Sequence, residues 1–162
     1  MSTIGDLIGD VVRFKNHKNP GTLRPAFRYI REHNNKSGGL VGVEIGVQNG
    51  VNALSVLQNL PIKMLYLVDP YEAYIDYDGC HYPDMDEIFL DARERLSGFN
   101  DKIKFVKEYS VKASEILSDN LDFVYIDGNH SYEFVKQDIM CWFPKVRVGG
   151  VLGGHDLQYQ GV

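Results

Sequence analysis

The sequence has little cysteine, no long apolar run and no block of basic residues, and each shortage excludes a class of protein. Its two cysteines, Cys80 and Cys141, are too few and too far apart for a disulfide scaffold or a zinc knuckle, so we expect both to stay reduced. No stretch approaches the roughly 20 apolar residues of a membrane span, and residues 1–6 lack a signal-peptide pattern. The sequence therefore predicts a cytoplasmic protein with no membrane partner.

Charge excludes a further class. The chain carries 17 Lys and Arg against 22 Asp and Glu, a formal net charge of −5. Nonspecific binding to nucleic acid depends on clustered Lys and Arg, which are absent here, so we expect no nucleic-acid partner. The 162 residues, 44% of them hydrophobic, fit one compact domain with a core of its own.

The chain divides into a short helical part and a longer alternating part. Two helical patterns, 4–14 and 22–33, are separated by turn residues, and we expect this segment (1–37) to pack on a domain formed by 38–162. From there on, short apolar runs alternate with helical patterns, which is typical of strands joined by crossover helices. The predicted strands are 40–45, 64–68, 103–106, 121–126 and 148–153. They lack strict polar alternation, so we expect them to be buried on both faces, and they predict an α/β fold with a doubly wound, mostly parallel sheet.

Two of the predicted helices carry further signals. Ser110 stands where a cap is expected for the helix that follows the third strand. A last helix is predicted at 131–143, and we expect one of its faces to be buried: Val135, Ile139, Trp142 and Phe143.

The turn after the first predicted strand and the acid after the second point to a nucleoside-like ligand. Gly46 and Gly50 permit a tight turn and close approach of the backbone to a ligand before a helix begins. Gln48 stands where a full dinucleotide-binding fingerprint has its central glycine. Asp69 follows the second strand, where an acid is placed to accept hydrogen bonds from a ribose diol. An ordinary strand-to-helix turn and a solvated acid remain the alternative.

Four further side chains follow the fourth and fifth predicted strands: Asp127, His130, His155 and Asp156. The ends of neighbouring parallel strands meet at one edge, so we expect these groups to gather there. Two carboxylates and an imidazole suit a divalent cation, with Mg²⁺, Ca²⁺ or Mn²⁺ favoured over Zn²⁺, and a second histidine can serve as a general base. The alternative is a helix cap at Asp127 and a polar loop at His155.

The longest stretch without a regular pattern, 70–83, is rich in tyrosine. Irregular segments of this length in a compact domain are often functional. Two interpretations stay open for its tyrosines: a lid over an aromatic or sugar acceptor, or a simple cover for the end of the sheet. The tyrosines concerned are Tyr71, Tyr74, Tyr77 and Tyr82.

Taken together, these motifs resemble those of class I S-adenosylmethionine-dependent methyltransferases, and within that class the small-molecule O-methyltransferases similar to macrocin-type sugar methyltransferases. The resemblance rests on 43–46 with Gly50, on Asp69, on the run Ile-Asp-Gly-Asn-His-Ser-Tyr at 126–132 and on Gly-Gly-Val-Leu-Gly-Gly-His-Asp at 149–156. It implies a Rossmann-like sheet of order 3-2-1-4-5 with the cofactor over the ends of strands 1 and 2.

The resemblance also implies roles for individual residues. Cofactor contacts fall on Glu44, Gly46, Gln48, Gly50, Asp69, Tyr109, Ser110 and Asp127. Glu44 and the glycines would line the methionine part, and the Tyr109–Ser110 turn the adenine. Metal-dependent relatives use an acid matching Asp127 and a pair matching His155 and Asp156, although His155 departs from the usual acid. Asn129 replaces an acid that serves as base in some relatives, which leaves His130 as the candidate base.

A second departure concerns the end of the chain. The class continues past strand 5 with a helix and a closing hairpin, whereas this sequence stops at Val162, so we expect the hairpin to be absent from these residues. The sequence leaves open a truncated piece or a natural minimal version. An uncovered strand edge would favour pairing with a second copy of the chain.

The function predicted is methyl transfer from S-adenosylmethionine to a hydroxyl of a small sugar or phenolic acceptor, with Asp127 and His130 as catalytic residues and a cation as helper. Two alternatives stay open: a nicotinamide-linked oxidoreductase, which Gln48 disfavours, and a noncatalytic nucleoside-binding or assembly module. The methyltransferase prediction requires Glu44, Asp69, Asp127 and Asp156 to lie at the same edge of one sheet.

Overall fold

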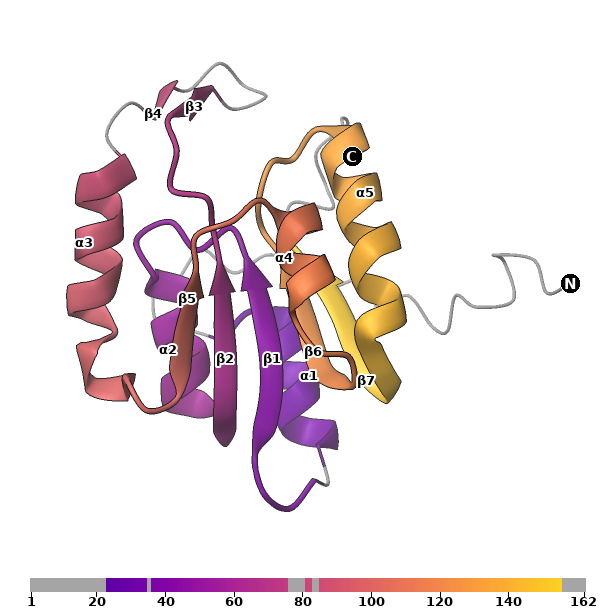
Figure 1. Ribbon diagram of the computed structural model, residues 1–162. Helices are drawn as coiled ribbons and strands as arrows, with labels where there is room; N and C mark the ends of the chain where they lie inside the picture. The colour runs from indigo at the N-terminus through magenta and orange to yellow at the C-terminus, as the bar shows by residue number, and fades with distance from the viewer. Residues whose placement is uncertain (1–22, 35, 76–80, 83–84, 156–162) are drawn as a thin grey trace, which may run out of the picture.

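The computed structural model describes residues 23–34, 36–75, 81–82 and 85–155. Five parallel strands form the central sheet (Figure 1). They are β1 (Leu40–Ile45), β2 (Ile62–Val68), β5 (Ile103–Val106), β6 (Leu121–Ile126) and β7 (Val146–Gly154). Their order is β5-β2-β1-β6-β7, which is 3-2-1-4-5 when only the strands of this sheet are counted. The predicted Rossmann-like fold is therefore confirmed.

The direction in which the chain builds the sheet reverses beside β1. From β1 the chain moves outward to β2 and β5, then crosses to the other side for β6 and β7. In open parallel sheets such a reversal opens a crevice beyond the carboxyl ends of the strands, where ligands bind. We call this the carboxyl edge of the sheet, and the opposite end the amino edge. Strands β1 and β6 are neighbours at the reversal, paired from Gly42 with Phe123 to Ile45 with Ile126.

Helices cover both faces of the sheet (Figure 1). One core cluster joins the sheet to α1 (Pro25–His33), α2 (Val51–Asn59) and α3 (Met85–Arg95), and the other joins it to α4 (Ser110–Ile116) and α5 (Tyr132–Trp142). Short 3-10 turns follow α3 at Ser97–Phe99 (η2) and α5 at Phe143–Lys145 (η3).

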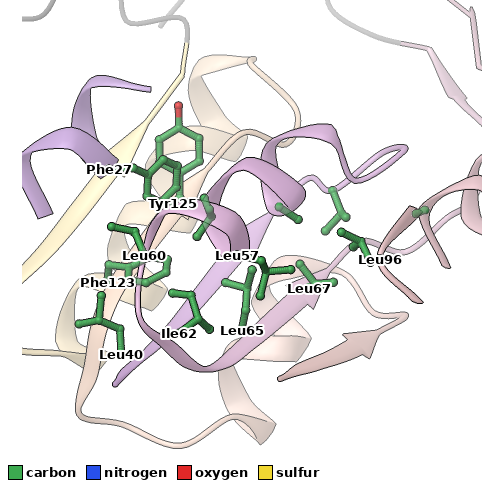
Figure 2. Close-up of a cluster of buried hydrophobic side chains, with 14 of the residues drawn as sticks. Phe27, Leu40, Leu57, Leu60, Ile62, Leu65, Leu67, Leu96, Phe123 and Tyr125 are labelled. Carbon is green, nitrogen blue, oxygen red and sulfur yellow. The ribbon is translucent and has the colours of Figure 1, made fainter. Parts of the chain in front are cut away.

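Strand β6 shows why these sequences form two-sided strands. All six of its residues are buried. Successive side chains of a strand point to opposite faces, and accordingly Phe123 and Tyr125 join the first cluster whereas Val124 and Ile126 join the second. Figure 2 shows Phe123 and Tyr125 beside Phe27 of α1 in the first cluster. The predicted double burial of the strands is confirmed here.

Several boundaries and contacts differ from the sequence prediction. Helix α1 begins at Pro25 and not at residue 22, because proline is favoured in the first turn of a helix, and the predicted helix 4–14 lies outside the described residues. The irregular segment after β2 contains a two-stranded antiparallel ladder, β3 (Tyr74–Ile75) with β4 (His81–Tyr82). The face predicted to be buried on the last helix is only partly buried: Trp142 is enclosed, but Ile139 on α5 and Phe143, which follows α5 in η3, are exposed.

Candidate functional site

The ends of β1, β2 and β6 are tied together at the carboxyl edge. The Gly46 N–H donates to the carbonyl of Val68 (2.9 Å), and the Asp127 N–H donates to the carbonyl of Ile45 (2.8 Å). Gly46 has a φ of +79°, and a Cβ at this position would lie 2.1 Å from the Asp127 carbonyl oxygen. Only glycine fits there, so this close approach of two loops explains the glycine that the sequence places after its first strand.

Asp69 joins the loop after β1 to the loop after β2 through hydrogen bonds. One carboxylate oxygen accepts hydrogen bonds from the backbone N–H groups of Val47 (2.9 Å) and Gln48 (3.0 Å), and the other accepts from the N–H of Tyr71 (2.9 Å). A carboxylate offers about four acceptor positions, so three of them are already used. The ribose contact expected of Asp69 stays a prediction, and the structure adds a role in shaping the loop after β1.

Tyr71 belongs to the hydrophobic core next to the Asp69 hydrogen bonds. It is buried, its hydroxyl donates to the carbonyl of Gln48 (3.0 Å), and its ring lies 4.7 Å from that of Phe89 on α3. Burial, followed by the nearby charges of Asp69 and Glu44, raises the pKa of Tyr71. Tyr71 therefore covers the end of the sheet and is not part of a lid. The side chains of Tyr74, Tyr77 and Tyr82 lie outside the described part of the structure.

Gln48 and Tyr71 both have an unusual backbone conformation. Their φ angles are +50° and +52°, in the left-handed region that side chains other than glycine rarely adopt. Strained backbone of this kind persists where surrounding contacts hold it, and it is concentrated at functional sites. Here the Asp69 and Tyr71 hydrogen bonds supply those contacts.

One oxygen of the buried Glu44 carboxyl group has no donor among the residues that the structure describes. Its side chain accepts from Asn52 Nδ2 at Oε1 (3.1 Å), whereas Oε2 has no hydrogen-bond partner among the described residues. Burial raises the pKa of Glu44 to about 8; the hydrogen bond from Asn52 opposes the shift, and the nearby charge of Asp127 adds to it. A buried carboxyl oxygen without a donor suits a ligand that brings a cationic or N–H group to this edge.

Asp127 is paired with a residue that the sequence prediction missed. Arg24, directly before α1, donates from Nη1 to Asp127 Oδ2 and to the hydroxyl of Tyr125 (3.1 Å). On the other side, His155 Nδ1 lies 3.3 Å from Asp127 Oδ1. Burial raises the pKa of Asp127 even though Arg24 and His155 favour the charged form. No local pattern marked Arg24, because its partner lies 103 residues away along the chain.

Of the four side chains expected after the fourth and fifth strands, the three that the structure describes lie at the same edge. Asp127 faces His155, and the His155 ring lies 6.4 Å from that of His130. Asp156 lies outside the described residues. Asn129 uses its carbonyl oxygen to accept from the Ser131 N–H (2.9 Å) and hydroxyl (2.5 Å), which shapes the turn into α5. The convergence of Glu44, Asp69 and Asp127 at one edge is confirmed. Glu44 lies near the end of β1, where Asp69 accepts from the Val47 N–H and the Asp127 N–H donates to the Ile45 carbonyl.

The expected metal set does not form in this part of the chain. No group of three or more His, Cys, Asp and Glu side chains that could hold an ion occurs in the described ranges, 23–34, 36–75, 81–82 and 85–155. Of the predicted ligands Asp127, His155 and Asp156, only the first two are described. One oxygen of Asp127 already accepts from the Arg24 guanidinium. As the structure holds them, Asp127 and His155 do not by themselves form a site for a divalent cation.

The turn after β5 connects to the turn after β2. The Tyr109 hydroxyl donates to Glu72 Oε2 (2.7 Å), an acid that sequence reasoning overlooked. Ser110, predicted to cap α4, is instead the first residue of that helix. Its hydroxyl accepts from Trp142 Nε1 (2.8 Å) and bonds to Asp138, whose pKa burial raises to about 6. Ser110 therefore ties α4 to α5, because its side chain points between the helices and not to the helix end.

A parallel sheet of order 3-2-1-4-5, with one acid near the end of its first strand and another directly after its second, matches the fold of the class I S-adenosylmethionine-dependent methyltransferases. Comparison with known families agrees: residues 43–157 match the family described as a methyltransferase domain. The chain belongs to this family. The search of curated proteins gave no match.

Solved structures share the fold at low sequence identity. A Corynebacterium glutamicum protein from a structural genomics programme has a TM-score of 0.59 at 18% identity, covering 78% of this chain and 53% of that one. A Podospora anserina methyltransferase with bound S-adenosylhomocysteine has 0.58 at 12%, covering 78% and 48%. An O-methyltransferase family protein from Burkholderia thailandensis has 0.52 at 14%, covering 79% and 36%. The chain thus spans about half the length of the first of these structures.

No described helix is both long enough and apolar enough to cross a bilayer.

Proposed function

We propose that this chain binds S-adenosylmethionine at the carboxyl edge and transfers its methyl group to a hydroxyl of a small sugar or phenolic acceptor. The observation that carries the proposal is the buried Glu44 Oε2, which has no donor among the described residues and lies where a methyltransferase-family sheet reverses. A ligand with an ammonium group would supply the missing donor. The acidic chain, with a net charge of −5, supports a small acceptor over nucleic acid.

The residues present fit the cofactor, part by part. Glu44 would hold the ammonium of its methionine moiety. Asp69 has one acceptor position left for a ribose hydroxyl, and Glu72 offers a more exposed carboxylate three residues further on. Tyr109 stands at the turn expected to face the adenine, and its bond to Glu72 joins the two turns.

The remaining residues position the acceptor and take its proton. When bound, the cofactor supplies a methyl group on a positively charged sulfur, so the protein has to hold the acceptor oxygen in line with it. His130 is the candidate base, because an imidazole accepts a proton near neutral pH. Asp127, fixed between Arg24 and His155, orients the histidine side of the site.

Isothermal titration calorimetry of the wild-type chain tests the cofactor. We expect one equivalent of S-adenosylhomocysteine or S-adenosylmethionine to bind and NAD to give no heat of binding. Glu44→Gln should weaken binding of S-adenosylhomocysteine by at least about tenfold, which corresponds to the loss of one charged hydrogen bond. Glu115→Gln, which changes an exposed acid on α4, is the matched control.

Binding of NAD in place of the sulfur cofactors would favour an oxidoreductase. A folded wild-type chain that binds none of the three would favour a noncatalytic module. If the sulfur cofactors bind, release of S-adenosylhomocysteine with a panel of sugar and phenolic hydroxyl compounds identifies the acceptor. His130→Ala should then lower turnover while leaving the affinity for S-adenosylhomocysteine unchanged.

A further inference from the structure

The backbone of Arg24 is fixed at the start of α1, and its side chain extends to the carboxyl edge. Its carbonyl accepts hydrogen bonds from the N–H groups of Phe27 (3.0 Å) and Arg28 (3.1 Å), which fixes it at the start of α1. Phe27 is buried, and its ring lies 4.7 Å from that of Tyr125 on β6 (Figure 2). The start of α1 is therefore pinned to the strand that ends in Asp127.

A glycine on β7 permits this close docking of α1. A Cβ on Gly153 would lie 2.9 Å from the Cβ of Ala26, which is closer than two such atoms normally approach. Without that side chain the helix can pack directly on the strand. The position of Arg24 thus follows from contacts with both β6 and β7, and not from its own ion pair alone.

The guanidinium then makes three contacts at the carboxyl edge. Nη1 donates to Asp127 Oδ2 and to the Tyr125 hydroxyl (3.1 Å), and the guanidinium carbon lies 5.4 Å from the centre of the Tyr125 ring. The Arg24 side chain is 29% exposed, against 14% for Asp127. Arginine remains charged at any accessible pH, and its planar group gives several fixed donors. The site therefore contains a permanent, accessible positive charge.

We propose that Arg24 is the resident cation of this site and occupies the place on Asp127 that a divalent cation would need. A bound ion requires a carboxylate oxygen as ligand, whereas Oδ2 accepts from Arg24 and Oδ1 faces His155 Nδ1. The Arg24 guanidinium, hydrogen-bonded to Asp127, also repels a second cation that approaches the same carboxylate. This inference deepens the proposed function: Arg24 acts as a positioning residue for Asp127 and balances negative charge beside the acceptor without a metal.

Titration with Mn²⁺ alone, followed by electron paramagnetic resonance, tests the proposal without cofactor or acceptor. We expect the wild-type chain and Arg24→Lys to leave the signal of free Mn²⁺ unchanged. Arg24→Gln exposes the Asp127 oxygen and should raise Mn²⁺ affinity by about tenfold or more, since the repelling charge is gone. Adding Asp127→Asn to this variant should abolish the gain. Arg31→Gln, exposed on the same helix, is the matched control and should show no gain.

Two results would overturn the proposal. One is stoichiometric Mn²⁺ binding by the wild-type chain that Asp127→Asn removes; the other is an Arg24→Gln variant that is folded by circular dichroism and binds no more Mn²⁺ than wild type. If Arg24→Gln does not fold, Arg24→Lys decides: Mn²⁺ binding by this variant that Asp127→Asn removes refutes the proposal, and its absence supports it. Failure of S-adenosylhomocysteine to bind wild type would count against the proposed function only.

Discussion

Asp122 and Asp127 lie near opposite ends of strand β6, and their carboxylates differ in hydrogen-bond partners and in the direction of their pKa shifts. At the amino edge, Asp122 accepts from Lys36 Nζ (2.7 Å), the Val41 N–H (2.8 Å) and Arg147 Nε (2.7 Å). Burial opposes the shift, but these three donors together lower the pKa of Asp122 below its usual value. Burial raises the pKa of Asp127 in spite of its cationic neighbours.

The difference separates a structural acid from acids available for chemistry. A buried carboxylate with a full set of donors is stable in its charged form and has little left to offer a ligand. At the carboxyl edge, Glu44 keeps an oxygen without a donor among the described residues and has a pKa of about 8. Perturbed pKa values of this kind are concentrated at functional sites, so the contrast supports the carboxyl edge as the proposed site and gives Asp122 a structural role at the amino edge.

The most damaging single change should be Gly46→Ala at the carboxyl edge. The added methyl group would meet the Asp127 carbonyl at 2.1 Å, and the residue would have to keep a φ of +79°. We expect a loss of about 3 kcal/mol in the free energy of unfolding, from left-handed strain and overpacking together. Urea denaturation measures the loss.

Gly98→Ala is the matched control for that change. A Cβ on Gly98 has no heavy atom within 4 Å and its φ is not positive, so its unfolding midpoint should stay close to that of wild type. Equal midpoints for Gly46→Ala and wild type would show that the two loops are not in close contact in solution.

At the amino edge, Asp122→Asn should cost about 2 kcal/mol at pH 7, because the neutral amide replaces a buried charge that two cations share. The folded pKa of Asp122 lies below the ordinary 3.8. The charged form therefore stabilises the fold above pH 3.8, and this contribution disappears as the pH falls through the lowered pKa. Chemical denaturation at pH 7 and at pH 3 should show the difference between variant and wild type shrinking.

Asp119→Asn gives the comparison for an exposed acid, since Asp119 pairs with Lys145 at the surface. Its cost should stay below about 1 kcal/mol. A cost for Asp122→Asn that is equally small, or that grows toward acid pH, would contradict the structural role assigned to Asp122.

An effect of opposite sign is expected for Glu44→Gln. The folded pKa of about 8 lies above the ordinary 4.5, so the folded chain keeps a proton that the unfolded chain releases, and stability falls as the pH rises between these values. The amide removes this penalty, so we expect the stability of the variant relative to wild type to increase as the pH rises from 4.5 to 8, and the two to be equal at pH 4. Thermal unfolding across this range measures the effect.

Cofactor binding offers a second check on Glu44. A cationic ligand group favours the charged carboxylate, so binding of S-adenosylmethionine by wild type near pH 7 should release protons, and Glu44→Gln should release fewer. Calorimetry in buffers of different ionisation enthalpy counts these protons.

A stability difference between variant and wild type that does not change with pH would mean that Glu44 is ionised in the folded chain.

Much of the fold was predictable from the sequence. Apolar runs marked all five strands to within two residues at each end, because β1 and β6 are buried on both faces and carry little polar alternation. The strand order came from the resemblance to a known class. The convergence of Glu44, Asp69 and Asp127 followed from a simple rule, that residues directly after parallel strands share an edge.

The predictions failed where the arrangement of the candidate site depends on long-range pairing. Nothing near Arg24 in the sequence indicates Asp127, 103 residues away, so a helix start could not be recognised as part of the site. Asp69 was correctly placed, but the backbone N–H groups that occupy it depend on the exact path of two loops. Ser110 was expected at a helix end on residue preference alone, whereas packing against Trp142 decided its role.

The pairing of β1 with both β2 and β6 has a consequence for how the domain assembles. The contacts between β1 and β2 join segments close in the chain and can form early, whereas those between β1 and β6 close a loop of roughly 80 residues and are expected late. During synthesis, the half of the crevice formed by β1 and β2 therefore emerges well before Asp127 does. The carboxyl edge is therefore complete only after β6 has paired with β1.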